Sequence, residues 1–220
     1  GTFFILNLSR TQVKMNDLIK KLERQLIQAH NPILNEMDWD FNWKDKQSIE
    51  SAFRLLELEC CPELLDLYLW KTGCAHELLL DLSEGEENQI KLSSMGNYAA
   101  YSLSRDIMTQ NKIMQASYAD DDRMYPFIFN GVYEDPILID LDSSRETYKA
   151  LFYYSPQVLL SDAPIMIYDS IESWLKTIIQ CYEQNIYSVD EKGIFQSKTN
   201  LEVQLSRSMN PKSDYWLLDF

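Results

Sequence analysis

The sequence is poor in the residue types and motifs that catalytic sites usually require. Histidine occurs only at His30 and His76, and the six glycines are scattered singly along the chain. No GxGxxG or GxxxxGKS/T run is present to cradle a phosphate, and no GxSxG run is present to form a nucleophile elbow. We therefore expect a protein that is not an enzyme.

Cysteine is also scarce. Cys60, Cys61, Cys74 and Cys181 are too few in 220 residues for a disulfide scaffold, so we predict reduced, buried thiols. A zinc site built from Cys61, Cys74 and His76 would lack the paired ligand spacing of structural zinc sites. A Cys74–His76 nucleophilic pair would lack a third group to orient it. We expect neither a metal ion nor another cofactor.

Long apolar runs, leader sequences and linkers are missing as well. Residues 1–8 are apolar but short, with no cationic leader and no small-residue cleavage site. No stretch approaches the roughly 18 apolar residues that cross a bilayer. These features predict a cytoplasmic protein without membrane contact. Because no Pro/Gly/Ser-rich linker and no repeat divides the chain, we expect residues 1–220 to form a single domain.

Acidic residues, by contrast, are abundant. The chain has 34 Asp and Glu against 20 Lys and Arg, a net charge of −14. Residues 1–45 carry six of each sign, residues 46–147 carry 8 basic and 19 acidic side chains, and residues 148–220 carry 6 and 9. Such a field repels nucleic acid and anionic membranes and speeds encounter with a basic protein. Solubility alone is the simpler explanation of the same charge.

Three groups of carboxylates stand out in segments that lack hydrophobic periodicity. Each is explained by a solvated loop, by a docking surface for a basic partner, or by metal coordination. The run of three like charges at 120–122 is costly to hold together unless it is solvated or faces a cation. The candidate partner-binding residues are Glu84, Glu86, Glu87, Asp120, Asp121, Asp122, Glu134 and Asp135.

Hydrophobic periodicity predicts helices first, then closely spaced strands, then one strong helix. Helices are expected at about 15–29, from Asp45 or Ser48 to about 56, at 62–73 and at 171–182, with a weaker helical patch at 104–114 and with Asp169 as the N-cap of the last helix. Strands are expected at 77–82, 125–129, 132–133, 136–140, 150–154 and 164–168, with Asn130-Gly131 as a hairpin signal. This order predicts an α+β fold with a mainly antiparallel, twisted sheet and helices packed on it.

The order of these segments resembles the SUKH superfamily. The likeness rests on residues 49–55, on Cys61-Pro62 opening a helix that carries Tyr68, and on Thr72-Gly73 closing it. The family pattern has Leu-Pro and Asn-Gly at those two places. Downstream, residues 125–128, 136–140 and 151–154 are similar to three consecutive sheet strands of the family, and residues 167–175 to its final helix.

This resemblance implies a SUKH-like core at about 46–187, with an N-terminal helical extension at 1–45 and a C-terminal tail at 188–220. The family includes cell-wall-assembly regulators of the Smi/Knr type and bacterial immunity proteins that neutralise toxins, and it supplies no catalytic residues. We therefore expect a non-catalytic immunity protein that occludes a basic toxin, of nuclease or deaminase type, with an acidic surface. The alternative is a regulatory or scaffold protein of the cell-wall-regulator type.

Overall fold

The computed structural model describes residues 2–37, 45–74, 90–99, 123–130, 136–161 and 163–218, with side chains from residue 14 onward. Helices and an antiparallel sheet coexist, so the predicted α+β class is confirmed. The helices are α1 (Thr2–Gln28), α2 (Ile33–Glu36), α3 (Lys46–Leu55), α4 (Pro62–Trp70), α7 (Pro156–Leu159), α8 (Ile171–Glu183), α9 (Thr199–Met209) and the 3-10 turn η2 (Tyr215–Leu217). The strands are β1 (Asn97–Tyr98), β2 (Met124–Phe129), β3 (Ile137–Asp140), β4 (Leu151–Tyr153), β5 (Ile165–Tyr168), β6 (Tyr187–Val189) and β7 (Phe195–Ser197).

The main sheet has five strands in the order β1-β2-β3-β4-β5, and every neighbouring pair is antiparallel. Four of these strands, β2 to β5, coincide with predicted strands to within two residues. A bulge in β2 falls between Pro126 and Ile128, beside a proline that has no N–H to donate to a ladder. The strands that we predicted at 77–82 and 132–133, and the helical patch at 104–114, lie outside the described residues.

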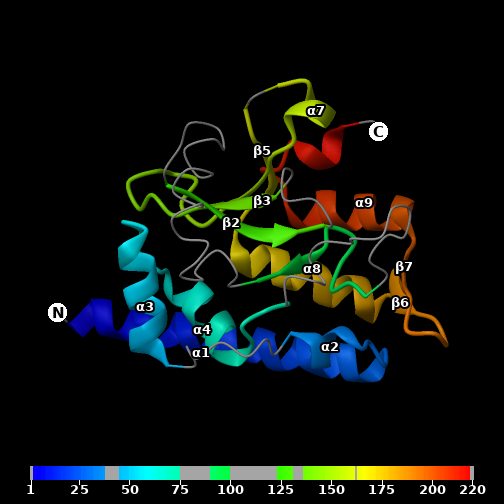
Figure 1. Cartoon of the computed structure of the whole chain (residues 1–220), viewed down its shortest axis with the longest axis horizontal. Coiled ribbons are helices and arrows are strands. Elements are labelled where there is room, and N and C mark those ends of the chain that lie inside the picture. The colour runs from blue at the N-terminus through cyan, green and yellow to red at the C-terminus, as the bar shows by residue number, and fades with distance from the viewer. Residues whose placement is uncertain are drawn as a thin grey trace.

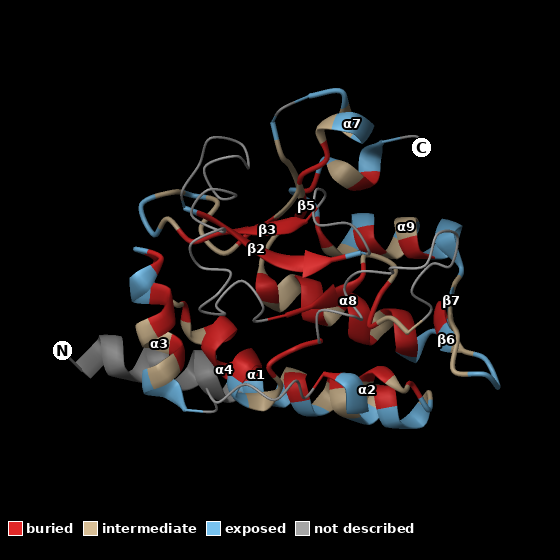
Figure 2. Ribbon diagram, viewed as in Figure 1, coloured by how far each residue is buried: buried red, intermediate tan, exposed pale blue. Residues whose placement is uncertain are grey.

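Two layers of helix lie beneath the sheet. Figure 1 shows α8 under the strands and α1 running below α8. Figure 2 shows that β2, β3 and much of α8 are buried, whereas the outer face of α1 is exposed. The buried stripe of α1 repeats at Met15, Ile19, Leu22 and Leu26, which is the predicted helical period. The helix itself begins earlier than predicted, at Thr2.

Side chains cap three of the helices, α3, α7 and α8, and the caps are Asp45, Ser155 and Ser170, residue types that are common at this position. Asp45 accepts a hydrogen bond from Ser48 N at 2.9 Å, which fixes the start of α3 where it was predicted. For α8 the predicted cap is wrong by one residue. Ser170, not Asp169, accepts from Ser173 N at 3.0 Å, and Asp169 instead accepts from Lys212 N at 3.2 Å.

The C-terminal residues are folded rather than a polar tail. The β6–β7 hairpin leads into α9, and η2 then returns to the outer edge of β5. Trp216 Nε1 donates to Ile167 O at 2.7 Å, and Ser213 Oγ donates to Met166 O at 2.8 Å. These contacts dock the closing aromatic segment on the core, and they cover a sheet edge that would otherwise be open to pairing.

Candidate functional site

All eight acidic residues that the sequence nominated lie outside the described residues. They are Glu84, Glu86, Glu87, Asp120, Asp121, Asp122, Glu134 and Asp135. Within the part of the chain that the structure does describe, side chains of Lys and Arg are nearly as numerous as those of Asp and Glu. Most of the net negative charge therefore belongs to residues outside the described ranges.

The flanks of two acidic segments lie side by side at the end of β1. Residues 75–89 follow Cys74, whose N–H donates to Tyr98 O at 3.0 Å. The same segment ends before Ile90, whose carbonyl accepts from Asn97 Nδ2 at 3.0 Å. Asn97 also pairs with Phe129 in the sheet, shortly before residues 131–135 begin. The described flanks of the two segments that hold Glu84, Glu86, Glu87, Glu134 and Asp135 therefore lie next to one another.

The described residue next to the third acidic cluster lies at the other end of β2. Asp120, Asp121 and Asp122 immediately precede Arg123, at the beginning of β2, whereas Asn130 follows its end. A six-residue strand spans about 20 Å. The structure thus brings together the flanks of two predicted clusters and separates the flank of the third from them by the length of β2.

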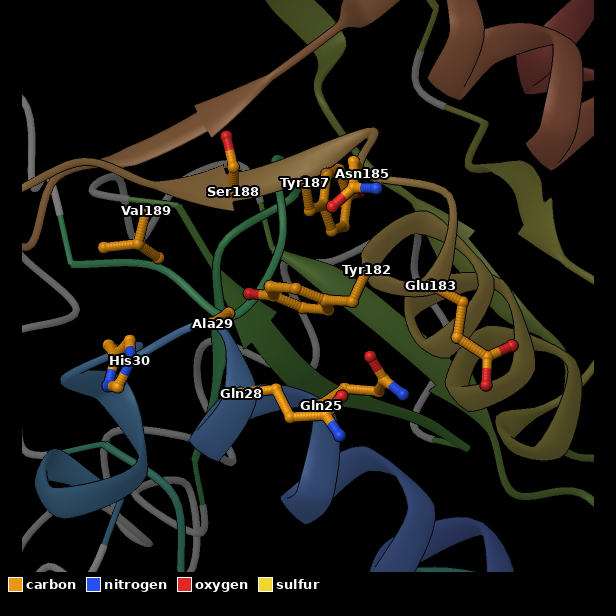
Figure 3. A pocket seen from close by; sticks show the side chains of 10 residues that line it. All are labelled: Gln25, Gln28, Ala29, His30, Tyr182, Glu183, Asn185, Tyr187, Ser188 and Val189. Carbon is orange, nitrogen blue, oxygen red and sulfur yellow. The ribbon is translucent and has the colours of Figure 1, made fainter.

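A cavity of about 470 Å³ opens between the end of α1, the end of α8 and β6 (Figure 3). Both helices reverse there through left-handed residues, His30 at φ 52° and Asn185 at φ 54°, as chain reversals at helix ends often require. Three amides, Gln25, Gln28 and Asn185, line the cavity together with the His30 imidazole. Amides both donate and accept hydrogen bonds, so this lining suits a polar, peptide-like ligand.

Two buried tyrosines form the inner wall of this cavity. The rings of Tyr182 and Tyr187 meet edge to face with centroids 5.4 Å apart. Tyr182 OH accepts from Asn31 Nδ2 at 2.8 Å and donates to Leu92 O at 3.0 Å. Burial raises the pKa of both phenols. The wall is therefore neutral and held in place by hydrogen bonds to the chain beside it.

The two titratable groups on the rim are not arranged for acid–base chemistry. In Figure 3 the Glu183 carboxylate points away from His30, on the opposite side of the cavity. Glu183 is also engaged by Lys21 Nζ at 2.8 Å and by Gln180 Nε2 at 2.5 Å. A general base must lie within hydrogen-bond reach of its partner. The cavity is better suited to binding than to proton transfer.

The described cysteines are free, as predicted, and three of the four are fully buried while Cys60 is half-buried. Burial raises the pKa of Cys61 to about 12 and that of Cys181 to about 12, with Glu63 and Glu202 as the next contributors. In the described ranges no three His, Cys, Asp or Glu side chains gather as a metal site. His76 lies outside those ranges.

We predict that the folded protein reacts very slowly with the thiol reagent DTNB at pH 8. Raised thiol pKa values lower the thiolate fraction of Cys61 and Cys181 by about a thousandfold or more relative to an exposed cysteine. Stopped-flow absorbance should therefore show both thiols reacting at a normal rate only after urea is added. Rapid labelling of either residue in the folded state, located by mass spectrometry, would contradict the burial seen here.

Sequence reasoning missed the cavity because its residues come from two distant segments and are individually ordinary. The one available signal was Gln25 and Gln28, two amides one turn apart on a face of α1 that is otherwise rich in charge. No helix in the described ranges has the length and apolarity of a bilayer-crossing segment.

Comparison with known proteins adds no relative: no protein-family model matches the chain and no curated protein is similar to it. The resemblance to the SUKH superfamily thus stays a prediction.

Proposed function

We propose that this chain is a non-catalytic binding protein for a basic protein, acting as an immunity protein that occludes a toxin of nuclease or deaminase type. The observation that carries the proposal is the charge distribution, with 8 basic against 19 acidic side chains in residues 46–147. A surface of one sign raises the association rate with a partner of the other sign and discriminates against wrong partners.

Two features of the structure support this proposal. The described flanks of residues 75–89 and 131–135 meet at Asn97, which supports a shared role for the acidic residues of both segments. Residues 75–89 alone contain five Asp or Glu and no Lys or Arg. In addition, the polar cavity beside His30 can accept a peptide-like group of a partner. Acidic segments would set the encounter rate, and the cavity would add hydrogen bonds in the complex.

Co-expression with the open reading frames that adjoin its gene tests the proposal directly. Each neighbouring frame is expressed alone and together with this protein, and growth is followed. We expect one neighbour to encode a basic domain that arrests growth alone and is neutralised by a stable one-to-one complex. If every toxic neighbour stays toxic and none binds the purified chain in calorimetry, the proposal is wrong.

Charge reversal then identifies the acidic segment that steers association. Replacing Glu84, Glu86 and Glu87 by Lys should slow association with the neutralised toxin about tenfold or more at low salt, and should flatten the salt dependence of the rate. The matched control makes the same charge change at Asp17, Glu191 and Asp214, which are exposed and lie outside the acidic segments. Stopped-flow fluorescence gives the rates. Equal slowing by both triple variants would mean that net charge, and not this segment, sets the rate.

A further inference from the structure

A second cavity, of about 390 Å³, lies between α9, η2 and residues 94–95. Its walls are largely apolar and aromatic, formed by Met95, Val203, Tyr215 and Trp216. Trp216 and Tyr215 meet edge to face with centroids 5.0 Å apart. The indole N–H of Trp216 is already donated to Ile167 O. The ring is therefore held in a fixed orientation beside the cavity.

One charged group also lines this cavity. Glu202 is 3% exposed, and its carboxylate is held by three hydroxyls. Ser94 Oγ and Tyr187 OH both donate to Oε1, the latter at 2.6 Å, and Ser197 Oγ donates to Oε2 at 2.6 Å. Burial, with the neighbouring Glu202 carboxylate as the next cause, raises the pKa of Tyr187. The phenol therefore remains a proton donor to the carboxylate.

The hydroxyl cradle leaves the negative charge of Glu202 unpaired with any described cation. No Lys or Arg in the described ranges forms an ion pair with it. A buried carboxylate is normally paired with a cation as well as hydrogen-bonded. A carboxylate has about four acceptor positions, and three are used here. The N-terminal end of α9, which also lines the cavity, offsets part of the charge.

We propose that this cavity binds an organic cation, an alkylammonium or alkylguanidinium group, with Glu202 as its counter-ion and Trp216 and Tyr215 as its aromatic wall. A carboxylate, a desolvated pocket and aromatic rings are the combination that recognises such cations. The group comes either from a free small amine or from a Lys or Arg side chain of a bound polypeptide. This proposal does not depend on the function proposed above.

Titration with n-butylammonium chloride tests the proposal on the full chain. The readout is the Trp216 indole N–H signal in nitrogen-15 NMR spectra, assigned by its loss in Trp216→Phe, with sodium chloride at equal ionic strength as the blank. We expect a saturable shift in the wild-type protein. A shift that does not saturate, or that sodium chloride reproduces, would overturn the proposal.

Three variants separate a specific site from a general charge effect. Glu202→Gln keeps the shape and should weaken binding at least about tenfold. Asn200→Lys places a cation on the exposed rim and should weaken binding similarly, which keeps the test valid if Glu202→Gln fails to fold. Asp214→Asn removes an exposed charge outside the lining and should bind as the wild type does. Undiminished affinity in a folded Glu202→Gln variant or in Asn200→Lys would refute the assignment.

The source of the cation follows from a second titration, with the peptide Gly-Gly-Lys-Gly-Gly. If the peptide shifts Trp216 with an affinity like that of butylammonium, a side chain of a polypeptide can enter the cavity. If butylammonium binds and the peptide does not, the site belongs to free amines. If neither binds, no organic cation occupies this cavity and the proposal fails.

Discussion

Replacing Gly73 by alanine should destabilise the protein by about 2–5 kcal/mol, adding the left-handed backbone cost to the cost of overpacking. Gly73 has a φ of 90°. A Cβ built there would lie 2.3 Å from Tyr98 O and 2.5 Å from Ala99 Cα. These are backbone atoms that cannot rotate aside. Gly73 also donates its N–H to Met37 O at 3.0 Å, so any shift breaks a second contact.

Gly193→Ala is the matched control for that experiment. Gly193 has a similar φ of 84°, but the nearest atom to its added Cβ is the Pro32 side chain at 3.3 Å. Both variants therefore pay a similar backbone cost of about 1–2 kcal/mol, and the difference between them isolates the close approach at Gly73. Urea unfolding followed by circular dichroism gives both free energies. Equal destabilisation would show that the approach of Gly73 to β1 is looser than described here.

Gly73 also matters for the proposed function. It precedes residues 75–89 by two positions and bridges Ala99 beside β1. The residue thus fixes the described flank of that segment against β1. In a Gly73→Ala variant that still folds, we expect slower partner association because the start of that segment is displaced.

The sheet and the central helices were predictable because their burial follows simple periodicities. Strands β2 and β3 are buried at every position, and each was visible as a short apolar run bounded by turn residues. Helix α8 buries Ile171, Trp174, Leu175 and Ile178 on one face. In these elements the apolar residues that form the sequence pattern are also the residues that pack in the core.

Helix α9 was missed for the opposite reason. Its most buried positions are Glu202 and Ser206, and Asn210 at its C-cap continues the same spacing of four residues. Asn210 Nδ2 donates to Thr177 Oγ1 at 3.1 Å, and its Oδ1 accepts from Ser173 Oγ at 2.6 Å. The inward stripe of α9 is therefore polar, and no apolar period marks it. Hydrogen bonds across to α8 replace the hydrophobic contacts that sequence reasoning relies on.

The two cavities were unpredictable from sequence for a related reason. Each is assembled from short segments far apart in the chain, and Tyr187 links them by lining one and donating to Glu202 in the other. Nothing in the local sequence around Tyr187 or Glu202 distinguishes them from surface residues. The charge asymmetry, in contrast, follows from counting residues in the sequence, whereas Asn97 and the β1–β2 register show only that the flanks of two acidic segments meet.

Trp174→Ala should be the most damaging substitution in the core, costing about 3–5 kcal/mol because it removes a large buried ring and leaves a cavity. Trp174 is fully buried on α8. Its ring meets Phe127 of β2 at 5.2 Å and Tyr98 of β1 at 6.0 Å between centroids, both edge to face. One side chain therefore joins α8 to β1 and β2, the two strands beside which the flanks of the acidic segments lie.

Trp174→Phe is the informative comparison. It keeps an aromatic ring against Phe127 and removes the indole N–H, which is buried without an acceptor among the described residues. Removing an unsatisfied donor recovers part of its desolvation cost, so we expect the phenylalanine variant to lose less than half as much stability as the alanine variant. Urea unfolding supplies both values, and equal losses would contradict an edge-to-face role for this ring. Because Trp174 touches neither cavity, a folded Trp174→Phe protein should bind partner and butylammonium with unchanged affinity, which separates the role of this core residue from that of the binding sites.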